Sequence, residues 1–127
     1  MIVGSVNLNG EAIVGLRVGI PRSSAVTIDA IIDTGFDGWL TLSPSLIQSL
    51  ALRFREEGRF TLADGSEAST KLFGAEIDWL GGWRPILVVS MDGEPLLGMA
   101  SMHGCHLGID VVKGGRVEIR PMTSHAR

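Results

Sequence analysis

The chain has 127 residues, a mass of 13.5 kDa and a formal net charge of −3. This length predicts a single domain over residues 1–120 with a loose tail over residues 121–127, and the negative charge argues against a general affinity for nucleic acid. A hydrophobic content of 45% excludes a disordered chain, and 17 glycines predict many turns and therefore many short strands.

The first third of the chain predicts a hairpin and a third strand. Apolar residues occupy the even positions on both sides of Asn9-Gly10, which is the pattern of a hairpin over residues 2–20. The even-position pattern resumes over residues 26–32 and runs directly into Asp33-Thr34-Gly35. Residues 39–42 then predict a short strand.

A helix and three further hairpins are expected after these strands. Ser43-Pro44 predicts an N-cap and a first helical residue, in a helix that should be the only one longer than two turns. Hairpins are predicted over residues 60–73, 77–91 and 111–119, and a short helical stretch over residues 99–103. Turns at this spacing predict an all-β fold, a closed barrel or sandwich with one or two short helices.

Histidine and cysteine do not predict a site. His103 and His106 have no carboxylate at metal-ligand spacing, so they are expected in turns or on the surface, and no metal or cofactor is predicted. Cys105 should be a small buried hydrophobe, because no basic neighbour would lower its pKa. The single cysteine, the lack of a basic segment before Arg17 and the short apolar run over residues 86–89 predict a cytoplasmic protein without a membrane span.

One carboxylate attracts attention because of its surroundings. Asp33 follows the apolar pair Ile31-Ile32 and precedes Thr34-Gly35 and Phe36-Asp37. A carboxylate beside two isoleucines is costly to desolvate unless something uses it, and the glycine allows a sharp turn and the close approach of a ligand. Taken alone, Asp-Thr-Gly is an ordinary β-turn sequence without a function.

In context, residues 31–37 resemble the active-site loop of the retroviral-type aspartic proteases, the retropepsin-like family of clan AA. Leu96-Leu97-Gly98 is similar to that family's second signature, two apolar residues and a glycine shortly before a C-terminal helix. Residues 62–66, Leu-Ala-Asp-Gly-Ser, look like the tip of the flap, a hairpin that closes over the substrate, in the form common in bacterial and retroelement members. Together with Asp-Thr-Gly-Phe over residues 33–36, this tip suggests the bacterial and archaeal branch. The resemblance covers residues 1–110 and implies a retropepsin-like barrel with one Asp-Thr-Gly loop per subunit.

The resemblance also implies roles for individual residues. Asp33 would be the catalytic aspartate, Thr34 would join two active-site loops by hydrogen bonds across a dyad, and Gly35 would offer its carbonyl to the substrate. The remaining substrate-binding residues would be Asp37, further along the peptide, and Asp64, Gly65 and Ser66, which would cover it. Leu96-Leu97-Gly98 would pack behind the loop. Met99 departs from the retroviral branch, which has an arginine there, and the predicted C-terminal hairpin departs from an interface built from chain termini.

Aspartic proteolysis needs two carboxylates that share one proton. The chain has one Asp-Thr-Gly, and Asp29 lies four residues earlier on the same predicted strand, about 13 Å away. The second carboxylate must therefore be Asp33 of another copy in a two-fold homodimer. The leading hypothesis is a homodimeric aspartic endopeptidase that acts on peptides or proteins. The alternatives are a non-catalytic peptide-binding or interaction module with the same barrel, and an unrelated small-ligand β-barrel with a coincidental motif.

Overall fold

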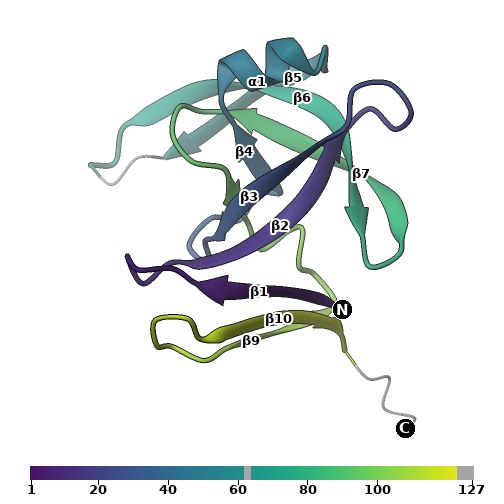
Figure 1. Cartoon of the computed structure of the whole chain (residues 1–127). Coiled ribbons are helices and arrows are strands. Elements are labelled where there is room, and N and C mark those ends of the chain that lie inside the picture. Colours follow the sequence, from purple (N-terminus) through teal and green to yellow (C-terminus); the bar gives the residue numbers. More distant parts are fainter. Residues whose placement is uncertain (62–63, 123–127) are drawn as a thin grey trace, which may run out of the picture.

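The protein is an all-β structure, seen here in a computed structural model that describes residues 1–61 and 64–122 (Figure 1). The one helix of this part, α1, spans Pro44–Ser49. Its strands are β1 (Ile2–Val6), β2 (Ala12–Gly19), β3 (Val26–Ile32), β4 (Leu40–Leu42), β5 (Arg53–Thr61), β6 (Glu67–Trp79), β7 (Gly82–Ser90), β8 (Leu96–Leu97), β9 (Cys105–Ile109) and β10 (Arg116–Pro121). The predicted fold class is therefore confirmed.

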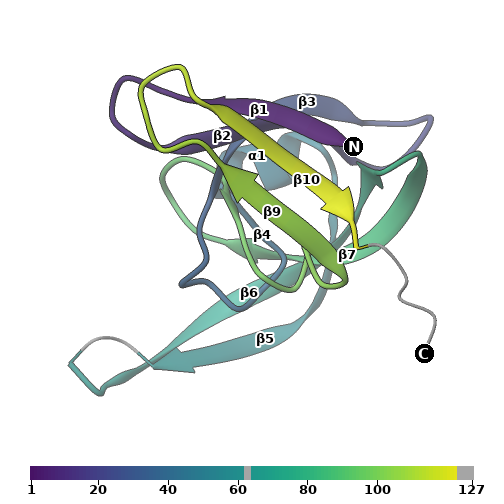
Figure 2. The ribbon, with the colours of Figure 1, turned by 90° about the horizontal axis from the view of Figure 1, so that it is seen from below.

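All of these strands belong to one sheet, in the order β5-β6-β7-β4-β8-β3-β2-β1-β10-β9. An additional pairing between β2 and β6 closes β2, β3, β8, β4, β7 and β6 into a ring. Outside the ring, β1, β10 and β9 form a layer below it in Figure 1, and the outer part of the β5–β6 hairpin projects from it. We call this projecting outer part of the hairpin, which includes its tip at residues 64–66, the arm. Figure 2 shows the same layer and arm from below.

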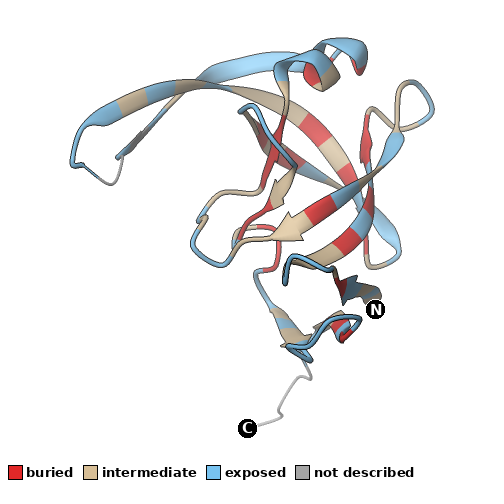
Figure 3. Cartoon of the chain, turned by 60° about the vertical axis from the view of Figure 1, so that its left-hand side comes forward, coloured by how far each residue is buried: buried red, intermediate tan, exposed pale blue. Residues whose placement is uncertain are grey.

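The core lies inside the ring, as the period-two pattern predicts. Successive side chains of a strand point to opposite faces, so the even positions of β2 all enter the core. Figure 3 shows buried segments gathered in the ring strands, whereas the arm is exposed or half-buried. The fully or nearly fully buried residues of the ring strands include Val14, Leu16, Val18, Ala30, Leu40, Leu42, Ile77, Val88 and Leu97.

The predicted hairpins around residues 9–10 and 81–82 are confirmed by the β1–β2 and β6–β7 pairings. The hairpin predicted over residues 60–73 is longer than expected, because β5 already begins at Arg53 and β6 continues unbroken to Trp79. Leu62 and Ala63, part of the predicted flap tip, lie outside the described residues. So do residues 123–127 of the predicted tail, while β10 extends to Pro121.

Two helix predictions need correction. Ser43 is the N-cap as expected, but α1 has 6 residues, and Ala51, with a φ of 54°, turns the chain away soon after its end. Residues 99–104 form consecutive turns and no helix. The backbone bonds of this segment join residues three apart, from Ser101 to Gly98, from Met102 to Met99 and from Cys105 to Met102, which are the bonds of successive turns and not of an α-helix. Among the described residues, no helix is both long and apolar enough to cross a membrane.

The last hairpin also differs from its prediction. The first strand of this hairpin is β9, which ends at Ile109, so it lies earlier in the chain than predicted. Val111 and Val112 are therefore not in a strand. They lie in the loop over residues 110–115, where the amide of Val112 donates to the carbonyl of Asp110 at 2.8 Å. Cys105, which begins β9, is half-buried against the core, and His103 and His106 are exposed as predicted.

Candidate active site

Asp33 stands directly after β3, where the pairing of β3 with the parallel strand β8 holds its backbone. Ile31 and Ile32 pair with Leu96 and Leu97 of β8, and the Asp33 amide continues this ladder by donating to the Leu97 carbonyl at 3.0 Å. The residue is half-buried, so its carboxyl group lies at the edge of the core without being sealed from solvent.

The turn after β3 orients the Asp33 side chain. The amide of Gly35 donates to Asp33 Oδ1 at 2.9 Å, and the amide of Phe36 donates to the Asp33 carbonyl at 3.2 Å. A carboxylate that accepts a bond from the backbone two residues later is the usual aspartate-led turn. Thr34 and Gly35 are exposed at its apex. The loop therefore presents one oriented carboxyl group beside an accessible backbone.

A second segment clamps this loop from behind. Residues 98–100, which directly follow β8, lie along the loop and donate one amide after another to its carbonyls. The bonds run from Gly98 to Trp39 at 2.9 Å, from Met99 to Phe36 at 2.8 Å and from Ala100 to Gly38 at 3.0 Å. Leu96-Leu97-Gly98 thus packs behind the loop, as expected from the sequence.

The clamp requires glycine at position 98. A Cβ placed there would lie 2.2 Å from the carbonyl oxygen of Gly38 and 2.5 Å from Cδ2 of Phe36. Gly38 is itself covered by the Phe36 ring, since a Cβ there would lie 2.6 Å from two ring atoms. The close backbone contact explains why a glycine follows the two leucines. Phe36 belongs to the motif recognised from the sequence, whereas Gly38 was not recognised as a residue that shapes the site.

Two buried hydroxyl groups complete the support. Ser101 Oγ donates to the Trp39 carbonyl at 2.7 Å, and Thr41 Oγ1 accepts the amide of Leu96 at 2.9 Å. Ser101 is 0% and Thr41 2% exposed. The sequence offered one signal that was not used, a polar Thr41 between two leucines of a fully buried strand. Ser101 has no comparable signal, because its partner lies 62 residues away.

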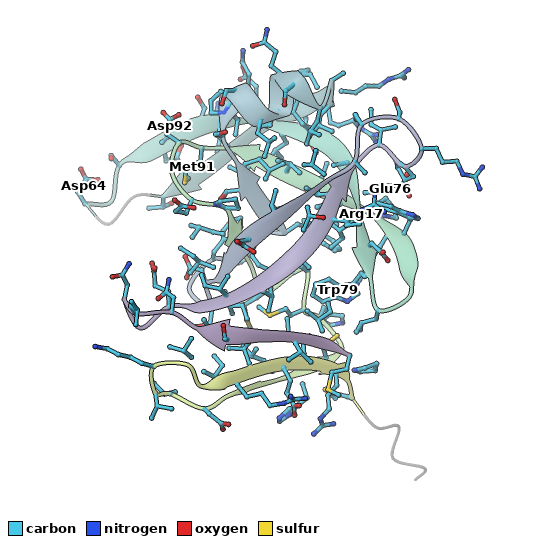
Figure 4. The ribbon with its side chains drawn as sticks, viewed as in Figure 1. Arg17, Asp64, Glu76, Trp79, Met91 and Asp92 are labelled. Carbon is cyan, nitrogen blue, oxygen red and sulfur yellow. The ribbon has the colours of Figure 1, made fainter. Side chains whose placement is uncertain are left out.

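The remaining predicted site residues fall into two groups. Asp37 is exposed on the same loop as Asp33, whereas Asp64, Gly65 and Ser66 lie at the tip of the arm. Figures 1 and 2 show this tip standing clear of the loop over residues 33–39. Figure 4 shows Asp64 at the end of the arm, away from the ring. A single chain therefore does not bring the two groups together.

The tip has its own aspartate-led turn. Both the amide and the hydroxyl group of Ser66 donate to Asp64 Oδ1, at 2.9 and 2.5 Å. These two bonds favour the ionised form, with the hydroxyl contributing most, and lower the pKa of the Asp64 carboxyl group below its ordinary value. The turn gives this exposed tip a defined shape.

Two hollows open beside Trp39, at the end of the loop over residues 33–39, and neither is lined by residues 33–37. The larger, of about 830 Å³, is lined by Ile20, by Trp39 and by residues of β2 and of β5 to β7, among them Arg53 and Glu76. The smaller, of about 630 Å³, lies beside Trp39, where the Arg84 guanidinium stands 5.5 Å from the centre of the indole ring. Within residues 1–61 and 64–122, no cluster of three or more histidine, cysteine or acidic side chains could hold a metal ion.

The chain was compared with family models, curated proteins and solved structures. No family model and no curated protein matches the chain. Among solved structures it is similar to the EIAV protease complexed with the inhibitor HBY-793, with a TM-score of 0.55 and 17% identity, over 74% of this chain and 86% of that one. The chain has a retropepsin-like fold. This agrees with the fold implied by residues 31–37 and 96–98, while the bacterial and archaeal branch stays a prediction.

The loop with Asp33 and the arm are both parts of this retropepsin-like fold. In this chain Asp33 is carried on the loop between β3 and β4, and the arm is formed by β5 and β6. The individual roles predicted for Asp33, Thr34, Gly35 and Asp37, and for residues 64–66, remain predictions about this retropepsin-like chain.

Proposed function

We propose that this protein is an aspartic endopeptidase that hydrolyses peptide bonds as a homodimer, with one Asp33 carboxyl group from each copy. The observation that carries the proposal is the clamped loop, in which the amide of Gly35 and the pairing with Leu97 orient an accessible Asp33. An oriented acid on a retropepsin-like fold is the starting point for acid–base attack on an amide.

The proposed reaction uses two carboxyl groups that hold one proton between them. The ionised carboxylate removes a proton from a water molecule, and the water oxygen attacks the peptide carbonyl carbon. The protonated partner donates its hydrogen bond to the carbonyl oxygen, where negative charge develops. When the tetrahedral intermediate breaks down, its C–N bond is cleaved and the leaving amine takes the proton that the first carboxylate removed from the water. Two carboxyl groups close enough to share a proton are not both ionised, because their negative charges repel each other. The shared proton is therefore a property of the pair.

Substrate binding in this proposal involves both groups of predicted residues. An extended peptide lies across the loop, where Thr34 stabilises the pair of loops, the Gly35 carbonyl accepts a backbone amide and Asp37 holds the chain further along. The arm tip, Asp64 to Ser66, closes over it. Its exposed position and its separation from the loop in the free chain are consistent with a flap that opens and closes.

A non-catalytic peptide-binding module is a second candidate, and one observation favours it. β5 is an outermost strand of the sheet, so its free edge can pair with an extended peptide without any contribution from a second Asp33. Such a module would bind peptides and leave them intact. A cytoplasmic location, drawn from the sequence, is part of either proposal.

Cleavage of a mixed peptide library separates the two candidates. We expect wild-type protein to cleave peptides, and a transition-state inhibitor of aspartic proteases to stop it. The Asp33→Asn variant should be inactive, whereas Asp29→Asn, which changes an exposed carboxylate on the same strand, should retain activity. Excess Asp33→Asn chain should also suppress the wild-type activity once subunits exchange. Binding of peptides without cleavage at any protein concentration or pH would instead identify the non-catalytic module.

A further inference from the structure

A dimer that joins two Asp33 residues needs more surface than the loop itself offers. Stable interfaces bury about 800 Å² per partner, contributed by roughly 20–30 residues. The exposed loop over residues 33–37 is far smaller than this. If the proposed homodimer exists, a neighbouring surface must provide most of the contact.

The most exposed large hydrophobic side chains of the described residues lie at two loop ends. Leu8 is 81%, Val111 80% and Val112 65% exposed. Leu8 lies in the turn between β1 and β2, and the two valines lie in the loop between β9 and β10. Branched apolar side chains exposed to this degree are costly in water, and together they mark a contact surface. We call these two loops the hairpin tips.

The hairpin tips are joined into one unit. The amide of Val6 donates to the carbonyl of Gly115, and the amide of Gly114 donates to the carbonyl of Val6, both at 2.9 Å. The Asn7 side chain closes the first tip by accepting the amides of Asn9 and Glu11 at 3.0 and 2.9 Å. Because both tips are held by their own hydrogen bonds, binding through them orders little additional chain.

The hairpin tips face the same way as the active-site loop. In both Figure 1 and Figure 2 the β1–β2 turn, the β9–β10 loop and the loop directly after β3 lie on the left. The start of β1 and the end of β10 lie on the right in both views. A partner that reaches Asp33 therefore meets the tips, and not the outer ends of β1 and β10.

Charge gives a second reason for an apolar contact here. The loop after β3 carries Asp33 and Asp37, so two copies of it repel each other when they approach. The hairpin tips offset this repulsion by burying apolar surface, and Lys113, at the end of the second tip, adds a positive charge for the partner's acidic residues. This combination fits a second copy of the same chain.

We propose that Leu8, Val111 and Val112 form the main contact between two copies, with the two Asp33 loops meeting beside it. The inference rests on the proposed function, since the position of the two-fold axis is set by the shared carboxyl pair. In an isologous contact each substitution occurs twice, once from each copy.

Sedimentation velocity of a charge variant tests the contact. We expect wild-type protein to be a dimer. Val112→Glu should raise the dimer dissociation constant about 100-fold, because each of the two copies contributes a roughly tenfold loss of affinity. Val26→Glu is the matched control, because Val26 is also an exposed valine but lies at the end of β3 remote from Asp33. The control should remain a dimer, with an unchanged far-ultraviolet spectrum in both variants. A dimer that resists Val112→Glu as well overturns this inference and leaves the shared Asp33 pair intact.

Cross-linking tests the same contact in unmodified protein. The chain contains two lysines, Lys71 on β6 and Lys113 on the second tip. With a short amine-reactive reagent and a mixture of ¹⁴N- and ¹⁵N-labelled chains, we expect linkage between the two Lys113 residues. Linkage only through Lys71 would place the interface elsewhere and overturn the inference. A wild-type chain that stays monomeric even with a transition-state inhibitor would overturn the proposed homodimer and this contact with it.

Discussion

The clamp behind the active-site loop should make Gly98→Ala one of the most damaging single-methyl changes in the chain. The added Cβ meets the carbonyl oxygen of Gly38 at 2.2 Å and the ring of Phe36 at 2.5 Å. Ordinary van der Waals contact begins near 3.4 Å, so one of the two segments has to move by about 1 Å. The obstacle is backbone, which cannot swing aside as the end of a flexible side chain can.

The expected cost comes from what this movement disrupts. Overpacking a filled site costs about 1–3 kcal/mol. A shift of this size also stretches the bonds from Gly98 to Trp39 and from Met99 to Phe36 beyond hydrogen-bonding distance, at about 1 kcal/mol each. We therefore expect a loss of about 3–5 kcal/mol in the free energy of unfolding. For a chain of this length, that corresponds to a fall of about 10–20 °C in Tm.

Thermal unfolding followed by circular dichroism measures this loss directly. Gly82→Ala is the matched control, because a Cβ at Gly82 has no atom within 4 Å and its φ is not positive. The control should change Tm by no more than about 2 °C, because surface substitutions of this kind have effects within about 0.5 kcal/mol. A Gly98→Ala protein that melts within about 3 °C of wild type would refute the close contact between the two segments.

Three further predictions concern the site. Asp33→Asn should lower peptide cleavage by about 10²–10⁴-fold or more while the circular dichroism spectrum is retained, and wild-type turnover by this variant would remove Asp33 from the mechanism. Ser101→Ala removes the bond to the Trp39 carbonyl and should lower stability by about 1–2 kcal/mol, seen as a lower urea midpoint with an unchanged m-value. Because its pKa is lowered, Asp64 keeps the tip turn intact above the ordinary aspartate pKa of about 3.9, and the turn is lost as pH falls through the lower folded value. In an NMR titration Ser66→Ala should raise the Asp64 midpoint, and an unchanged midpoint would contradict the bonds at the tip.

The local features of this protein could be predicted from the sequence alone. Alternating apolar residues on both sides of Asn9-Gly10 predicted the first hairpin, because strand side chains point to opposite faces and the turn is made within residues 7–11. Ser43 was recognised as an N-cap because a side-chain oxygen before a helix satisfies an amide three residues on. The Asp33 loop was recognised from the resemblance of residues 31–37, 62–66 and 96–98 to family motifs, and the turn itself is local because it is made within residues 33–36.

Only the tertiary structure decided how distant segments meet. The pairing of β2 with β6 that closes the ring, and the contact of Gly98 with Phe36 and Gly38, join residues about 60 positions apart, and no local pattern encodes them. The turns over residues 99–104 and the loop position of Val111 were missed for a related reason. Both segments contain residues suited to regular structure. The amides of Met99 and Ala100 instead bond to carbonyls of the active-site loop, and residues 110–115 form the loop that joins β9 to β10. Local preferences amount to tenths of a kcal/mol per residue, and the packing and hydrogen bonds of a closed sheet outweigh them.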